Sequence, residues 1–254
     1  MMATRQGGRV LAPTLLALSG LAWLTLVLWG QSPYGRYLDH QQIDGGGGAL
    51  VLPVFVLGWL LMMVAMMLPT SLPLVRLFDT MTRRRTDHRR LVLLLLVGYL
   101  GVWSVFGIAI HALDAALHAL VRQSGGLAEH AWLIGPAVLV LAGVYQFTPL
   151  KYHCLDKCRS PLSFITERWR GRREHRAALR LGIDHGAFCV GCCWSLMVLM
   201  FAVGVGSLGW MLGLGAVMAI EKNVSWGRHL SLPVGVVLVA WGLVTALLGA
   251  PGSP

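Results

Sequence analysis

The stretch LVLLLLVGYLGVWSVFGIAIHA, from Leu91 to Ala112, decides the fold, because it contains no Asp, Glu, Lys or Arg. A helix needs about 20 mostly apolar residues to cross the roughly 30 Å hydrocarbon core of a bilayer. Two arginines, Arg89 and Arg90, stand directly before the stretch, where a helix would leave the membrane. The segment therefore predicts a transmembrane helix.

Six further apolar runs resemble this one. The sixth of the seven runs is the shortest and is followed by Glu221 and Lys222, so a tilted or re-entrant segment is the alternative there. We predict an all-α, polytopic bundle of transmembrane helices with about seven spans, six being possible. The other runs are Val10 to Gly30, Leu50 to Pro69, Ala131 to Leu150, Ala187 to Val205, Trp210 to Ile220 and Leu232 to Leu248.

The composition agrees with a membrane protein. Of the 254 residues 56% are apolar and 13% are charged, whereas a soluble domain carries about 25% charged residues. The segments between the runs are too short to bury a core of their own, so we expect one membrane domain over residues 1–254 and no soluble enzyme domain. No phosphate-binding loop, nucleophile elbow or H-E-x-x-H motif occurs, and we expect no catalytic residues and no enzyme activity.

The positive charge predicts the orientation. With seven spans, all but Arg36 and Arg122 of the 21 Lys and Arg residues fall on one side. Cytoplasmic loops carry such an excess, so we expect a bacterial inner membrane protein with a cytoplasmic N-terminus and a periplasmic or extracellular C-terminus. The net charge of +10 is explained by this bias and by anionic lipid, so the bilayer is the expected partner and nucleic acid is not. The run Gly45 to Gly48 is expected to be a flexible external linker.

The segment from Gly182 to Met197 carries the most chemistry. On a helix that advances about 100° per residue, one sector contains a ladder of imidazole, thiol and thioether groups, with Cys192 at its edge. Soft sulfur ligands select Cu(I), and a mixed His/Cys set also suits zinc, so we predict a metal site there. The alternative is that Cys and Met are only adaptable packing residues. The members of the ladder are His185, Cys189, Cys193 and Met197, and it continues to Met200.

A second group of ligands, His153, Cys154 and Cys158, begins where the fourth span reaches the same predicted cytoplasmic side. Cys154 and Cys158 are four residues apart, so both thiols lie on one side of a helix. Because the fifth span begins on that side, the second group can meet the ladder.

Two further features lie at the same predicted depth. The second span ends with Met66 and Met67, preceded by Met62 and Met63, and thioethers bind Cu(I) but reject hard cations. Glu221 ends the sixth span beside Lys222, where an ionisable pair is a functional-site hypothesis, although the two can also simply pair with each other or reach toward the interface.

A weaker candidate lies on the opposite side. His111, Asp114 and His118 are spaced three and four residues apart near the end of the third span. They could bind a metal, but an amphipathic interfacial helix needs no ligand and explains the same pattern.

At these residues the sequence resembles a bacterial family of predicted metal-binding integral membrane proteins, known as domain of unknown function 2182. The resemblance implies a metal-handling membrane protein, often described as a copper chaperone, with a shared metal-binding core over residues 50–226. The segments that carry it are MMVAMMLP at 62–69, GYLGVW at 98–103, YQFTPLKYHCLDKCRSP at 145–161, HGAFCVGCCWSLM at 185–197 and EK at 221–222.

We therefore expect a membrane protein that binds Cu(I), or alternatively zinc, at the cytoplasmic leaflet and exchanges it with a metal-donor or metal-acceptor protein. Two alternatives stay open. Cys192 and Cys193 with Cys189 could form a thiol redox centre, although pairing of adjacent cysteines is strained. A fixed metal ion could also merely hold the fourth and fifth spans together in an assembly factor.

Overall fold

The structure is a computed structural model, and it describes residues 7–32, 51–169, 174–203 and 208–249. The predicted all-α class is confirmed: the described residues form helices and contain no strand. The predicted linker at Gly45 to Gly48 lies outside the described residues. The helices are α1 (Gly7–Gln31), α2 (Val51–Thr70), α3 (Leu72–Thr82), α4 (His88–Gln123), α5 (Gly125–Glu129), η3 (Ala131–Leu133), α6 (Ile134–Tyr145), α7 (Pro149–Arg159), α8 (Pro161–Arg168), α9 (Glu174–Val203), α10 (Leu208–Asn223), η4 (Gly227–Leu230) and α11 (Ser231–Leu248).

Five helical segments in the described part of the chain are long and apolar enough to span a membrane. They correspond to the first, second, third, fifth and seventh apolar runs of the sequence. The segments are Leu11–Gln31, Leu52–Thr70, His88–Gln123, Glu174–Met200 and Gly227–Leu248.

The fourth predicted span is a bent pair of helices. Ala131–Tyr145 and Pro149–Arg159 meet at 63°. Pro149 cannot donate a backbone hydrogen bond, and the Thr148 side chain caps the new helix by accepting from the Lys151 N–H. The break therefore ends α6 and gives α7, which carries the second group of ligands, a direction of its own.

The sixth predicted span corresponds to α10, which has only 16 residues. At about 1.5 Å per residue it is roughly 24 Å long, less than the bilayer core. Counting the bent pair as one, up to six segments in the described part of the chain are long and apolar enough to span a membrane, which matches the lower of the two numbers that the sequence allowed.

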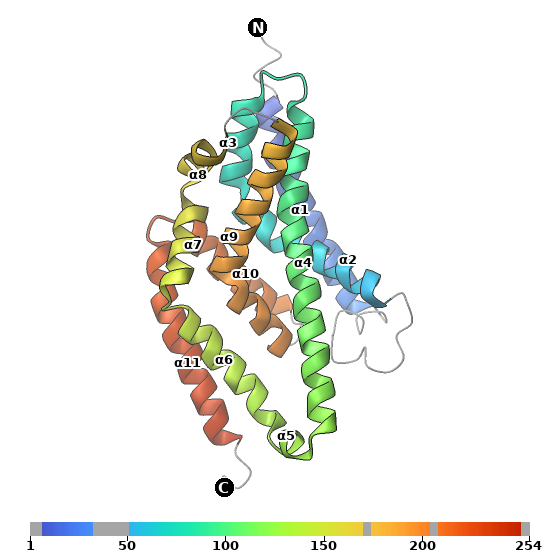
Figure 1. The fold of residues 1–254 in the computed structure, drawn as a ribbon, viewed down its shortest axis with the longest axis vertical. Coiled ribbons are helices and arrows are strands. Elements are labelled where there is room, and N and C mark those ends of the chain that lie inside the picture. Colours follow the sequence, from blue (N-terminus) through green and yellow to red (C-terminus); the bar gives the residue numbers. More distant parts are fainter. Residues whose placement is uncertain (1–6, 33–50, 170–173, 204–207, 250–254) are drawn as a thin grey trace.

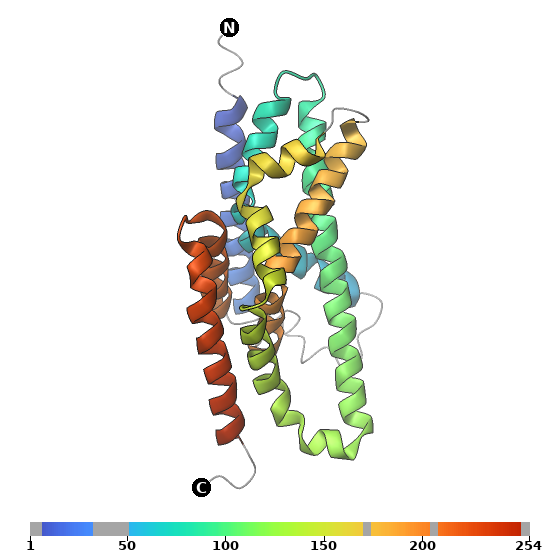
Figure 2. The same ribbon diagram turned by 60° about the vertical axis from the view of Figure 1, so that its left-hand side comes forward.

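The helices run mostly along one long axis. Figures 1 and 2 show the start of α1, the turn between α3 and α4, and α8 at one end of the molecule, with α5 and the end of α11 at the other. The pairs α4 with α9, α6 with α11 and α1 with α2 make the largest contacts. The start of α1 and the end of α11 lie at opposite ends of this axis (Figure 1).

Glycines allow α4 and α9 to approach closely. A Cβ on Gly98 would overlap the backbone carbonyl of Leu179, and one on Gly182 would overlap that of Leu95. Residue 101, also on α4, is a glycine whose Cβ would meet nothing within 4 Å.

These two positions on α4 give a matched test of that contact. Gly98→Ala should lower the free energy of unfolding by about 1–3 kcal/mol, because α9 must move away from α4. Gly101→Ala should leave it unchanged or raise it slightly, because alanine favours a helix. Thermal unfolding of both variants in detergent measures the difference, and equal effects would contradict the close approach.

The main buried core is rich in sulfur. It contains eight of the 11 methionines and four of the five cysteines, and Cys158 packs against it while partly buried. These side chains come from α2, α7, α9 and α10. Their positions are Met62, Met63, Met66, Met67, Met197, Met200, Met211, Met218, Cys154, Cys189, Cys192 and Cys193.

Candidate metal centre

Three thiols of α9 are gathered around one helical turn. Cys192 and Cys193 both donate their S–H groups to the backbone carbonyl of Cys189, at 3.1 and 2.9 Å. All three side chains are 1% exposed. The predicted ladder is therefore buried inside the bundle, with its thiols directed back along the helix toward Cys189.

The side chain of Lys222 enters this group of sulfurs from α10. Its Nζ lies 2.9 Å from the Cys189 Sγ, 3.9 Å from the Cys193 Sγ and 3.8 Å from the Met67 Sδ. One ammonium group thus contacts sulfur atoms from both α9 and α2. We call Met67, Cys189, Cys193 and Lys222 the inner sulfur site.

Tyr99 and His185 adjoin the inner sulfur site. The Tyr99 hydroxyl lies 3.2 Å from the Cys189 Sγ and 3.3 Å from the Met67 carbonyl oxygen, and the Tyr99 and His185 rings stack with their centroids 5.5 Å apart. The Nε2 of His185 is 3.2 Å from the Ser71 hydroxyl, whereas its buried Nδ1 has no hydrogen-bond partner among the described residues. A buried imidazole nitrogen without a partner is suited to bind a soft metal ion.

The structure brings the second group of ligands to the first through Cys158. Its Sγ lies 3.9 Å from the Sγ of Cys192, and we call this pair the outer sulfur pair. Cys154 also faces α9, since a Cβ built on Gly191 would lie 2.6 Å from its sulfur. His153 is exposed, and its ring lies 6.0 Å from that of Phe188. The structure therefore unites the two cysteine groups and leaves His153 at the surface.

Ion pairs hold the region next to Cys158. Lys157 on α7 bonds Glu167 on α8 at 3.1 Å, and Arg168 bonds Asp184 on α9 at 3.1 Å. Hydrogen bonds from the Lys157 ammonium and the Ser163 hydroxyl hold the pKa of the Glu167 carboxyl below its ordinary value. These contacts hold α8 against both α7 and α9.

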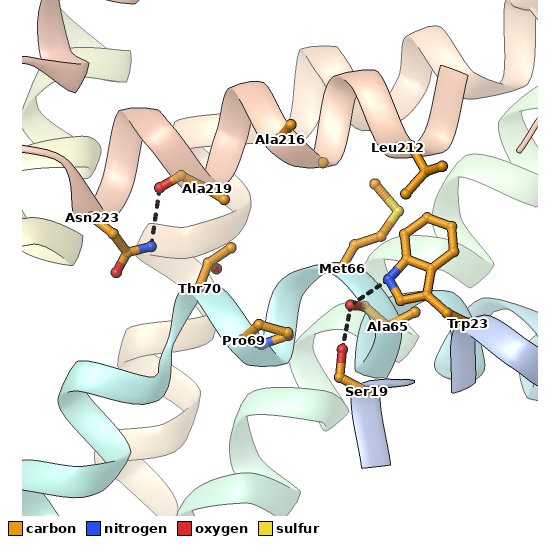
Figure 3. Close-up of a pocket in the computed structure, with 11 residues that line it drawn as sticks. Ser19, Trp23, Ala65, Met66, Pro69, Thr70, Leu212, Ala216, Ala219 and Asn223 are labelled. Carbon is orange, nitrogen blue, oxygen red and sulfur yellow. Dashed lines mark hydrogen bonds between the residues drawn. The ribbon is translucent and has the colours of Figure 1, made fainter. Parts of the chain in front are cut away.

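The two methionines at the end of α2 have different surroundings. Met67 belongs to the inner sulfur site, whereas Met66 lines a pocket of about 330 Å³ between α1, α2 and α10. Figure 3 shows Met66 pointing between Trp23 and Leu212 in that pocket. Met197 is fully buried in the sulfur-rich core, one helical turn beyond Cys193.

This difference predicts unequal effects of two conservative substitutions. Met67→Leu should weaken Cu(I) binding about tenfold, because it removes a soft donor beside Cys189. Met66→Leu keeps a similar volume and should leave binding within about twofold. Competition titrations with a Cu(I) chelator measure both affinities. Equal losses would show that the two methionines do not differ in this way.

Glu221 and Lys222 are neighbours in sequence but bond in different directions. Both Glu221 carboxylate oxygens accept from the Lys151 ammonium, at 2.8 and 2.9 Å, and one also accepts from the Ser231 hydroxyl at 2.6 Å. The Lys151 ammonium also donates to the Gln146 side chain. The carboxylate of Glu221 is thereby used to bind α7 and α11 to α10, and it is not the partner of Lys222.

On the opposite side, the three predicted residues make different contacts. The His111 ring stacks on Phe55 with centroids 4.4 Å apart, while His118 pairs with Asp114 at 3.5 Å. Over residues 7–32, 51–169, 174–203 and 208–249, no three His, Cys, Asp or Glu side chains are grouped so that they could hold a metal ion together.

A comparison with known protein families decides the class of the protein. A family model described as PpoB2, copper chaperone, matches residues 56–245. The chain belongs to this copper chaperone family. The matched residues include all five cysteines, the inner sulfur site, the outer sulfur pair and the buried Lys151–Glu221 pair. No curated protein and no solved structure matches the chain.

In this member of the copper chaperone family, sequence reasoning missed three residues of the site region. Tyr99 lies within an apolar run and Ser71 lies just after one, and nothing in the pattern marks them as neighbours of Cys189 and His185. Lys151 did carry a signal, since a basic residue directly after an apolar run can be buried and paired. The break at Thr148 turns its helix inward.

Proposed function

We propose that this chain is an integral membrane protein that receives Cu(I) from a donor and delivers it to an acceptor, with no catalysis of its own. The convergence of five cysteines and eight methionines in and against one buried core carries the proposal. Thiolate and thioether ligands bind Cu(I) well, and the family is one of copper chaperones.

The outer faces of the helices support a location in the membrane. Leucines project outward along α1 and α11, and a large continuous apolar surface is unfavourable in water. Lipid tails would cover such a surface without loss. These exposed side chains include Leu16, Leu18, Leu21, Leu24, Leu28, Leu232, Leu243, Leu247 and Leu248.

The distribution of Arg and Lys supports the proposed orientation. The turn between α3 and α4 contains Arg83, Arg84 and Arg85, and it lies at the same end of the molecule as α8 and the start of α1 (Figure 1). Positively charged ends of this kind face the cytoplasm of a bacterial cell. We assign this end to the cytoplasmic side of the inner membrane and the end of α11 to the opposite side.

The outer sulfur pair and the inner sulfur site suggest a route for the ion. Cys158 is partly exposed, whereas the other four cysteines are buried. It can therefore meet a Cu(I) donor. Cys192 then connects it to α9, where Cys189 and Cys193 lie within one helical turn. Sulfur ligands can exchange one at a time, so the ion passes from the outer sulfur pair to the inner sulfur site without being released into solvent.

The experiment is a Cu(I) titration of purified protein combined with transfer from a Cu(I)–glutathione complex. Wild type should bind Cu(I) and exchange it with an added chelator. Cys158→Ser should slow loading about tenfold and change the equilibrium affinity less than threefold, because the inner site is intact. Cys154→Ser, on the same helix but outside the outer sulfur pair, is the control and should load at a rate close to that of wild type. A wild type that binds no Cu(I) would overturn the proposal, and unchanged loading of the Cys158 variant would overturn the route.

One observation favours a second candidate, a membrane thiol redox protein. The sulfurs of Cys158 and Cys192 are 3.9 Å apart and come from different helices, so a disulfide between them avoids the strain of adjacent cysteines. Counting free thiols in metal-free protein, with and without oxidant, separates the two candidates. Reversible loss of two thiols without copper binding would favour the redox function.

A structural metal is the other alternative. An ion that merely fixed α7 against α9 would exchange slowly with a chelator, since no part of its role requires release. Exchange within the time of a delivery assay supports a chaperone, whereas copper retained over many hours supports a structural role.

A further inference from the structure

Lys222 is an unusual neighbour for a group of metal-binding thiols. Its side chain is 7% exposed, and its Nζ lies within 3.9 Å of the sulfurs of Cys189, Cys193 and Met67. A lysine ammonium cannot bind a metal ion, and a positive charge in this position repels any cation that approaches the same sulfurs. Its presence therefore affects which ions the site can accept.

Among the residues that the structure describes, no carboxylate pairs with Lys222. The nearest one in sequence, Glu221, is neutralised by Lys151, whose side chain is fully buried. A buried ammonium is strongly destabilised unless a negative charge lies beside it. The sulfurs of the inner site are the groups around Lys222 that can supply it, as thiolates.

The charge of the inner sulfur site depends on the ion that binds there. Two thiolates, from Cys189 and Cys193, together with one ammonium, carry a net charge of minus one. A monovalent ion such as Cu(I) brings this sum to zero, whereas a divalent ion such as Zn(II) leaves one unbalanced positive charge. An unbalanced charge in a buried environment is strongly unfavourable.

We propose that Lys222 determines the metal specificity of the inner sulfur site, and that its fixed positive charge makes the site accept monovalent soft cations and reject divalent ones. This inference rests on the proposed function, because it concerns the site through which Cu(I) would pass. Soft ligands alone would not achieve the same selection, since thiolates also bind Zn(II) well.

The binding step is balanced without any transfer of electrons. Binding of Cu(I) forms metal bonds to the sulfurs of Cys189 and Cys193, and any proton still on either thiol is released to water. Lys222 keeps its protons and continues to donate an N–H bond to the Cys189 sulfur. The lysine thus acts as a neighbouring charge, not as a ligand.

The test is a pair of competition titrations, one with Cu(I) and one with Zn(II), on wild type and on variants of Lys222. In the neutral variant Lys222→Gln, the ratio of Zn(II) affinity to Cu(I) affinity should rise at least about tenfold. Lys222→Arg keeps the charge and should retain a ratio close to wild type. Arg84→Gln, which removes an exposed cation in the turn between α3 and α4, is the control and should leave this ratio unchanged. Ag(I), a second monovalent soft ion, should compete with Cu(I) in wild type.

A general loss of structure lowers the affinities for both ions, so their ratio is not affected by it. Lys222→Leu provides a second neutral variant if the Gln variant is unstable. Cu(I) binding with an unchanged ratio in both neutral variants would overturn this inference alone. An equal change in Lys222→Arg would also overturn it, because the charge would then not be the cause. A wild type that binds no Cu(I) would overturn the proposed function and this inference together.

Discussion

Replacing Cys189, Cys192 and Cys193 together by Ser should lower the copper that co-purifies with the protein to below about one tenth of the wild-type content. The three sulfurs lie within one turn of α9, and each side chain is 1% exposed. Serine is close to cysteine in size, but its hydroxyl is a poor ligand for Cu(I). Metal analysis of protein purified from copper-supplemented cells measures the loss.

The fold of this triple variant must be shown to be intact. Its elution volume and thermal midpoint should remain close to those of wild type, because the hydroxyls can still donate to the backbone carbonyl of residue 189 within the helix. Met66→Leu, which lies in the pocket away from the inner sulfur site, should retain its copper in parallel. Copper retained by a folded triple variant would contradict the proposed function.

Breaking the buried pair of Lys151 and Glu221 should have the largest effect on stability. The two side chains are 0% and 2% exposed, and their charged atoms are 2.8 Å apart. Removing one partner leaves the other charge buried and unpaired, so Lys151→Met or Glu221→Met alone should cost about 3–5 kcal/mol. The double variant Lys151→Met/Glu221→Met should recover much of this loss, because both charges are then absent.

Unfolding in detergent measures this cycle of four proteins. Single variants within about 1 kcal/mol of wild type would show that the pair is not buried in the folded protein. The folded double variant also tests the sequence-based prediction that Glu221 is a metal ligand. Its copper content should equal that of wild type, since Lys151 and Ser231 occupy the carboxylate.

The helical class and the main apolar segments could be predicted from the sequence, because charge-free runs of sufficient length have few other structures available. The break between α6 and α7 could not be predicted from hydropathy, since the apolar run continues through Thr148 and Pro149. Proline stands there in the sequence, but an apolar run with proline can also be a kinked helix. The short length of α10, 16 residues, could be anticipated, because the sixth apolar run is the shortest of the seven and is followed by Glu221 and Lys222.

Part of the composition of the site could also be predicted from the sequence. Helical periodicity places Cys189 and Cys193 on one face of α9, since this depends on one helix alone. The contacts of Lys222 depend on how α10 packs against α9 and α2, and periodicity within a helix holds no information about that. The same limit explains why the sequence does not distinguish the adjacent residues Met66 and Met67, although the structure separates them.

The proposed function requires that Cu(I) is held by the cysteine sulfurs of α9, and X-ray absorption at the copper edge tests this requirement most directly. In copper-loaded wild type, we expect an edge typical of Cu(I) and a first shell dominated by sulfur at about 2.3 Å, similar to other metal–thiolate bonds. A first shell of nitrogen and oxygen only would contradict the proposal, as would a sulfur shell that persists unchanged when Cys189, Cys192 and Cys193 are all replaced by serine.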